Sequence, residues 1–197
     1  KDTGESAPVT NFSTVAALYM EQVQIVTLDP NIKTVADLEG KNVSIGANGS
    51  GVYFNALDIL GAYDLTEEDI TPQYQDFATS VDSLKDGKID AAFIVAGAPT
   101  TSIVQLATTQ EVHLVSLNDV YLVSLDDEHI DKLIASSPYY SKNVIAADVY
   151  GTPEDCTTVA VGAVVIAGND VSEDAVYDFV STVFENIGDL GHAKQDE

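Results

Sequence analysis

Residues 42–52 read NVSIGANGSGV, a short apolar segment followed by a glycine-rich turn. Apolar residues at helical spacing come next, so we predict a strand at 42–47, a turn at 46–51 and a helix at 53–62. The three glycines let the backbone adopt unusual dihedral angles and approach a bound molecule closely. The helix directs free N–H groups and its positive dipole end at the turn, which suits a carboxylate or another small anion. A tight turn in which Ser50 only caps the helix explains the same residues equally well.

The alternation of strand and helix continues on both sides of this region. Further strands are predicted at 23–28, 73–77, 90–96 and 113–117, and further helices at 34–38, 80–85 and 99–108. Short connections between such elements indicate the α/β class, with a mostly parallel sheet covered by helices on both faces. The later chain is predicted to add a helix at 128–136, a strand at 159–167 and an amphipathic helix at 171–187, whereas residues 1–14 read as loop.

A second strand ends in a turn and a helix at residues 94–100, which read IVAGAPT. Ligands of parallel sheets bind beyond the carboxyl ends of the strands, so this turn is predicted to share one site with the first turn. The residues concerned are Gly97, Pro99 and Thr100. Capping of the following helix by Thr100 is an alternative with equal support.

Catalytic and cofactor motifs are not matched. Gly51 is followed by Val52 and Tyr53, so the lysine of a phosphate-binding loop is missing, and the glycine spacing does not fit a dinucleotide fingerprint. Asn48 stands where a nucleophile elbow needs glycine. His113, His129 and His192 are not spaced as metal ligands. We therefore predict no catalytic residue, no metal and no cofactor, and a binding protein rather than an enzyme.

The composition of the chain excludes several classes of binding partner and some structural features. The formal net charge is −24, which opposes binding to nucleic acid and to anionic membrane surfaces. Hydrophobic residues make up 45% of the chain, enough for a real core, and no apolar run is long enough to cross a bilayer. Cys156 is alone, so an internal disulfide is excluded.

Several stretches together resemble one family, the TAXI-type receptors of TRAP transporters. They are ALYMEQVQIV at 17–26, VADLEGKNVSIG at 35–46, GSG at 49–51 with Asn55 and Ala56, AFIVAG at 92–97 with Pro99 and Thr100, TVAV at 158–161 and FEN at 184–186. These segments are similar to the family's "ALYPE…VQIV", "VADLKGKRVSVG", "GSGT..NA" and "AF..AG.PT" runs and to a later strand and helix. The similarity extends over residues 12–192 in the family's order.

The resemblance implies a type II periplasmic-binding fold, in which two doubly wound α/β lobes are joined by hinge strands and close on a small organic anion. It implies an extracytoplasmic receptor, periplasmic or anchored to the surface of a Gram-positive cell, that passes its ligand to a TRAP membrane permease. Family ligands are amino acids or dicarboxylates such as glutamate. Residues 31–118 would form the second lobe, and residues 1–30 and 119–197 would form the hinge and part of the first.

The chain also departs from the family's pattern. The family's opening glycine-rich strand, turn and helix have no counterpart here, so the sequence resembles a receptor trimmed at both ends with an incomplete first lobe. Met20 stands where proline is usual and Val52 where threonine is usual. An incomplete lobe would expose strand edges and apolar helix faces, so we expect a homodimer, and a clean monomer in light scattering at micromolar concentration would contradict it.

The resemblance and the two turns together define a predicted ligand site. The amides of Gly49, Ser50, Gly51 and Val52 are expected to bind a ligand carboxylate, with side-chain hydrogen bonds from Ser50 and Asn55. Tyr19 and Glu21 are expected at the hinge, where Glu21 would meet an α-amino group. Residues Gly97, Pro99 and Thr100 would form the facing wall. The first alternative is an intracellular effector-sensing domain of a transcriptional regulator with the same fold. The second alternative is an enzyme with that fold.

Overall fold

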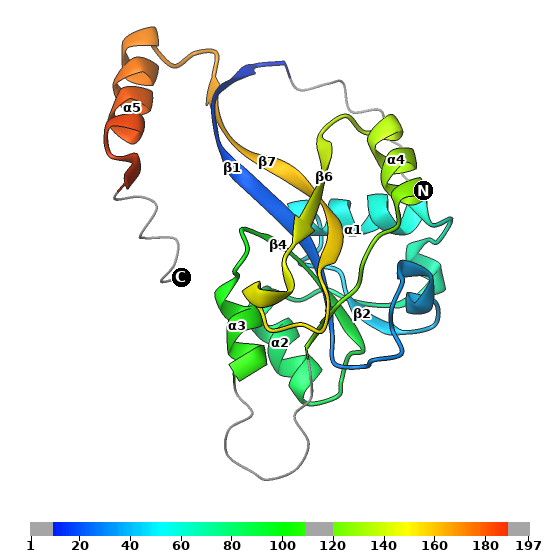
Figure 1. Ribbon diagram of the computed structural model, residues 1–197. Helices are drawn as coiled ribbons and strands as arrows, with labels where there is room; N and C mark the ends of the chain where they lie inside the picture. The colour runs from blue at the N-terminus through cyan, green and yellow to red at the C-terminus, as the bar shows by residue number, and fades with distance from the viewer. Residues whose placement is uncertain (1–9, 109–119, 189–197) are drawn as a thin grey trace. The chain divides into compact units, whose positions relative to one another are not determined.

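The structure, a computed structural model, describes residues 10–108 and 120–188. The chain divides into two compact units, unit 1 with Lys1–Tyr19 and Gly162–Glu197 and unit 2 with Met20–Val161. Two long strands, β1 (Phe12–Thr27) and β7 (Cys156–Gly168), have residues in both units (Figure 1). The lobe boundaries inferred from the resemblance stay a prediction, and the strand predicted at 113–117 lies outside the described residues.

Unit 2 contains a mixed sheet. Its other strands are β2 (Asn42–Ser44), β3 (Thr71–Gln73), β4 (Ala91–Ala96), β5 (Tyr121–Leu122) and β6 (Tyr140–Ile145). The strand order is β3-β2-β4-β1-β7-β6, with β5 beside β1. Strand β2 is parallel to β3 and β4, whereas β1 is antiparallel to β4 and β5, and β6 is antiparallel to β7. The prediction of a mostly parallel sheet is therefore wrong for the half of the sheet that contains β1, β6 and β7. Strands β6 and β7 follow each other through a short connection without a crossover helix, which allows only antiparallel pairing.

Five helices of unit 2 lie close to their predicted positions, namely η1 (Val35–Leu38), α1 (Gly51–Ala62), α2 (Phe77–Lys85), α3 (Thr101–Thr108) and α4 (Asp127–Ser136). Two short helices, η2 (Glu67–Asp69) and η3 (Ala147–Val149), were not predicted. The strand predicted at 73–77 is shifted, because the carboxylate of Asp76 accepts a hydrogen bond from the Thr79 amide at 2.8 Å and starts α2 at Phe77. Strand β6 was not predicted.

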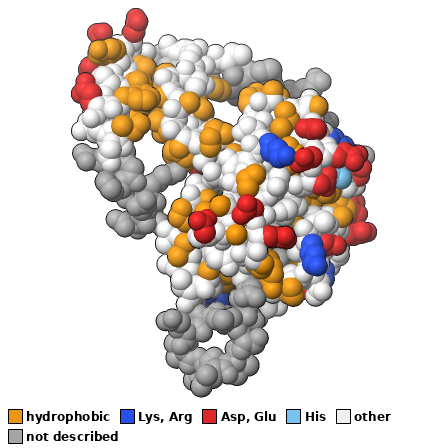
Figure 2. Space-filling model, viewed as in Figure 1, with side chains coloured by type: hydrophobic (Ala, Val, Ile, Leu, Met, Phe, Trp, Pro, Cys, Tyr) orange, Lys and Arg blue, Asp and Glu red, His pale blue; other side chains and the backbone are white. Residues whose placement is uncertain are grey.

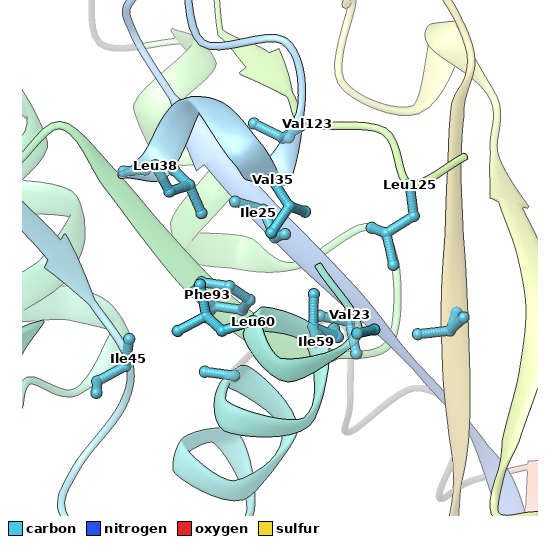
Figure 3. Close-up of a cluster of buried hydrophobic side chains, with 14 of the residues drawn as sticks. Val23, Ile25, Val35, Leu38, Ile45, Ile59, Leu60, Phe93, Val123 and Leu125 are labelled. Carbon is cyan, nitrogen blue, oxygen red and sulfur yellow. The ribbon is translucent and has the colours of Figure 1, made fainter. Parts of the chain in front are cut away.

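Two hydrophobic clusters cover the two faces of this sheet. Successive side chains of a strand point to opposite faces, and accordingly Phe93 belongs to the cluster with α1 and α4, whereas Ile94 belongs to the cluster with α2 and α3. Figure 3 shows Phe93 beside Leu60 and Ile59 of α1. The prediction of helices on both faces is confirmed.

Unit 1 consists of the outer parts of β1 and β7 together with α5 (Glu173–Glu185). The two strands are joined at their ends by Asn169, whose amide N–H donates to the Asn11 carbonyl at 2.8 Å. The loop predicted for residues 1–14 is therefore wrong from Phe12 onward, because β7 pairs with residues that carry little strand signal of their own. Helix α5 buries none of its side chains, and Figure 2 shows hydrophobic side chains exposed along it.

A hollow of about 520 Å³ lies within unit 1. It is lined by Val15 of β1 and by residues of α5, namely Glu173, Val176, Tyr177, Val180, Ser181 and Phe184. The hollow therefore separates part of α5 from Val15 of β1. In the described ranges, no helix is long and apolar enough to cross a membrane.

Candidate ligand-binding edge of unit 2

The glycine-rich turn after β2 has the backbone that its sequence predicts. Gly46 and Gly49 have φ angles of 82° and 75°, a region that other residues rarely occupy. A Cβ added at Gly46 would lie 2.7 Å from the Cβ of Val52. Gly46 therefore allows the turn to close tightly against the first turn of α1.

Ser50 is the N-cap of α1. Its backbone is extended, and its Oγ accepts a hydrogen bond from the Tyr53 amide at 3.2 Å. Helix α1 therefore begins at Gly51, earlier than predicted. Within the described residues, the amides of Gly49, Gly51 and Val52 have no hydrogen-bond acceptor. The turn thus combines both interpretations of the sequence, since Ser50 caps the helix and the adjacent amides remain available to an anion.

Asn55 and Val52 have structural partners. The Asn55 Nδ2 donates to the Tyr140 hydroxyl at 2.7 Å, and that hydroxyl donates to Asp58 at 2.9 Å. Burial raises the pKa of Tyr140 above its ordinary range, and the hydrogen bond to Asp58 adds to this. The half-buried Val52 packs against the hydrophobic core. Their contacts with a ligand stay a prediction, and the side chain of Asn55 donates toward β6.

The turn at residues 97–100 is held by a polar network. The Ala98 amide donates to Gln22 Oε1 at 2.9 Å, and the Thr100 amide donates to the Tyr150 hydroxyl at 2.6 Å. The Gln24 side chain is fully buried, donates to Thr100 Oγ1 at 2.9 Å and accepts from the Tyr150 hydroxyl. The helix predicted from residue 99 begins at Thr101, and Pro99 remains exposed in the turn.

Sequence reasoning missed Gln22, Gln24 and Tyr150 as the residues that position this turn. One signal was available: Gln24 stands between Val23 and Ile25 in a strand otherwise suited to the core. A buried amide side chain must find hydrogen-bond partners. The sequence offered no signal that Tyr150, far along the chain, would be one of them.

The strand register brings the two turns to one edge of the sheet. Strands β2 and β4 are parallel, with Ser44 opposite Ala92, so their carboxyl ends lie on the same side. Strand β1 is antiparallel to β4, with Gln22 opposite Ala96, which places the half-buried Glu21 at the same edge. We call this the carboxyl edge, formed by Glu21 and residues 46–52 and 97–100. Tyr19 is an exposed residue of unit 1.

A second cluster of ionisable groups lies at the other end of α1. The rings of Tyr63 and His129 stack at 3.7 Å, and Asp126 accepts from the Tyr63 hydroxyl at 2.9 Å and lies 2.7 Å from His129 Nδ1. Burial favours a higher pKa for Asp126, but the hydrogen bonds from His129 and Tyr63 outweigh it and lower the pKa to about 2. This cluster caps α4 and joins it to α1. In the described part of the chain, no group of His, Cys, Asp and Glu side chains is arranged to hold a metal ion.

Comparison with known proteins gives the family. A family model matches residues 2–196. The chain belongs to the NMT1-like family. The fold of this NMT1-like chain is also found in an ancestral arginine-binding protein, in structures bound to arginine (TM-score 0.53, 14% identity) and to glutamine (TM-score 0.53, 13% identity), each covering 93% of this chain and 61% of that one. The periplasmic aliphatic sulphonate-binding protein SsuA from Escherichia coli matches at 15% identity over 91% of this chain and 46% of its own, with a TM-score of 0.47.

The family match and the two structures of the ancestral protein confirm the predicted fold class. The NMT1-like chain has a mixed α/β fold like that of type II periplasmic binding proteins. It spans between 46% and 61% of the length of the structures named above.

Proposed function

We propose that this NMT1-like chain belongs to an extracytoplasmic solute receptor of the TAXI type, which serves a TRAP permease and has no catalytic role. Its ligand is a small organic acid or an amino acid, held by its carboxylate at the carboxyl edge. The observation that carries this proposal is the turn before α1, where the amides of Gly49, Gly51 and Val52 are without acceptors in the described chain. Hydrogen bonds from such amides stabilise a carboxylate, as does the positive end of the helix dipole.

Two further observations support the proposal. The network of Gln22, Gln24 and Tyr150 fixes the second turn at the same edge, so the wall of the site is formed before a ligand arrives. The ancestral protein that shares this fold binds arginine and glutamine, which are ligands of the proposed class.

The proposal is tested by removing one amide from the turn. Proline at the first position of a helix removes the N–H without disturbing the helix, and Ser50 already has the extended backbone that a residue before proline requires. Gly51→Pro is therefore expected to weaken carboxylate binding by roughly ten- to hundredfold, the effect of losing a hydrogen bond to a charged group.

The matched control is Gly51→Ala, which keeps the N–H and whose Cβ would have no neighbour within 4 Å. Isothermal titration calorimetry with L-arginine, L-glutamine, L-glutamate and succinate measures both variants. Equal affinity of the proline and alanine variants would exclude the turn as the anion site. Failure of every compound to bind the unsubstituted chain would refute the proposed function.

A further inference from the structure

An aromatic corner adjoins the glycine-rich turn at the carboxyl edge. Strand β3 is parallel to β2, with Gln73 opposite Ser44, so Tyr74 leaves the sheet at the same edge as the turn. The ring of Tyr53, in the first turn of α1, lies 6.2 Å from that of Tyr74 and 5.4 Å from that of Phe54. Phe54 and Tyr74 are 56% and 47% exposed. Aromatic ring surface is therefore accessible directly beside the amides proposed to bind a carboxylate.

One carboxylate is fixed within this corner. Glu67 accepts hydrogen bonds from the hydroxyls of Tyr53, at 3.0 Å, and Tyr74. These hydrogen bonds raise the pKa of Tyr53 and raise that of Tyr74 to about 12, so both phenols remain protonated donors at neutral pH. A carboxylate has about four lone-pair sites, and the two phenols occupy only part of them. Glu67 is thus held in place by neutral donors and has spare acceptor capacity.

The lysines of unit 2 are located elsewhere. All eight basic residues of the chain are lysines. Lys33, Lys85 and Lys88 belong to segments that begin or end at the opposite edge of the sheet, where β2 and β4 start. Lys41 also precedes β2, and its charge acts on Asp29. Lys132 binds Asp64 at 2.8 Å, at the far end of α1, and Lys142 binds Asp127 at 2.6 Å.

The carboxyl edge therefore has an unequal distribution of charge. Glu67 reaches this edge through its hydrogen bond with the Tyr53 hydroxyl, and Asp76 follows β3 there, so the acidic side chains at the edge in the described part of the chain are those of Glu21, Glu67 and Asp76. Its potential anion-binding groups are backbone amides. A second carboxylate on a ligand would meet negative charge there. A cationic group would meet a fixed carboxylate and aromatic faces, an arrangement that favours ammonium and guanidinium groups.

We propose, on the basis of the function proposed above, that the ligand is an amino acid with a cationic side chain rather than a dicarboxylate. Its carboxylate binds the turn before α1, and its distal ammonium or guanidinium group binds the corner formed by Tyr53, Tyr74 and Glu67. This assigns selectivity to three residues that the sequence motifs did not single out.

L-arginine and L-citrulline test the assignment, because citrulline has nearly the same shape but a neutral end. Calorimetry should show arginine binding at least tenfold more tightly than citrulline. Glu67→Gln should reduce that ratio to about one. The matched control, Glu68→Gln, makes the same change in net charge at the adjacent exposed residue and should keep the ratio.

Tyr74→Ala is the second variant, and it should lower arginine binding three- to tenfold through loss of one ring face. Circular dichroism confirms that each variant is folded. If L-glutamate or succinate binds at least as tightly as arginine, or if the two glutamine variants behave alike, the inference is overturned while the proposed function stands. If none of these acids binds the unsubstituted chain, both are overturned.

Discussion

Helix α1 of unit 2 and helix α5 of unit 1 have nearly equal lengths and similar N-terminal caps, but only α1 has buried side chains. Helices α1 and α5 have 12 and 13 residues, and each begins after a serine whose Oγ accepts from the third helical amide. Helix α1 buries Ala56, Ile59, Leu60 and Ala62, whereas α5 buries no side chain. All buried hydrophobic residues among those described belong to unit 2.

The comparison shows what a helix gains from the layer beneath it. Helix α1 lies on a sheet of several strands, and its apolar side chains enter a continuous cluster with η1 and α4. The described strands of unit 1 form a two-stranded ribbon, which provides too little apolar surface to cover a helix and is marginal by itself. The free energy that stabilises the fold is therefore concentrated in unit 2.

The largest expected difference is in the unfolding free energy lost when a phenylalanine of each unit is replaced by alanine. Phe93 of β4 is 1% exposed and Phe179 of α5 is 52% exposed. Phe93→Ala should reduce the free energy of unfolding by about 3–5 kcal/mol, because it removes a buried ring and leaves a cavity, whereas Phe179→Ala should change it by less than about 0.5 kcal/mol. Urea denaturation followed by circular dichroism measures both. Similar losses would mean that unit 1 has a core of its own.

The second expected difference concerns self-association. Unit 1 exposes Tyr177, Phe179 and Phe184 on α5, and the parts of β1 and β7 within it have no further strand partner among the described residues. We expect a second copy of the chain to cover this surface, giving a dimer at micromolar concentration. Tyr177→Ser should weaken the dimer by roughly 30-fold, equivalent to about 2 kcal/mol for an aromatic residue central to an interface.

The control for this prediction lies in unit 2. Tyr139 is 80% exposed there, more than the 71% of Tyr177, and Tyr139→Ser should leave association unchanged. Light scattering over a range of concentrations gives the mass of each variant. A monomer at all concentrations, or equal effects of the two substitutions, would show that unit 1 is not the self-association surface.

The sequence predicted the buried elements well, because burial leaves a local pattern. Residues 91–96 are apolar throughout and form the buried strand β4. Strand β6 was missed because Ser141, Lys142 and Asn143 interrupt any apolar run, and its strand structure depends on pairing with β7. Phe12 was placed in a loop for the same reason, since the residues that extend β1 pair with a segment about 150 residues later, near Asn169.

The candidate site was predictable in its backbone and less so in its side chains. The glycine spacing and Ser50 identified the turn before α1, because both requirements are local. Asn55 donates to Tyr140, a partner 85 residues away that no local pattern indicates, and its contact with a ligand stays a prediction. The corner formed by Tyr53, Glu67 and Tyr74 combines three segments whose proximity depends on the register of β2 and β3.

The smallest expected difference is between the two capping serines. The Oγ of Ser50 accepts from Tyr53 at 3.2 Å and that of Ser172 accepts from Ala175 at 3.3 Å, so each substitution by alanine removes a similar hydrogen bond. Ser50→Ala should lower the free energy of unfolding by about 1 kcal/mol, because α1 is part of the core and unfolds with it. Ser172→Ala should change the same quantity by only a few tenths of a kcal/mol, since α5 can fray without disturbing buried residues.

Hydrogen exchange should show the larger local effect in α5. Amides across α5 should exchange faster in Ser172→Ala, whereas those across α1 should change little in Ser50→Ala until the whole of unit 2 unfolds. Equal losses of unfolding free energy would mean that the two helices belong to one cooperative unit, and the contrast between the units would then be one of burial only.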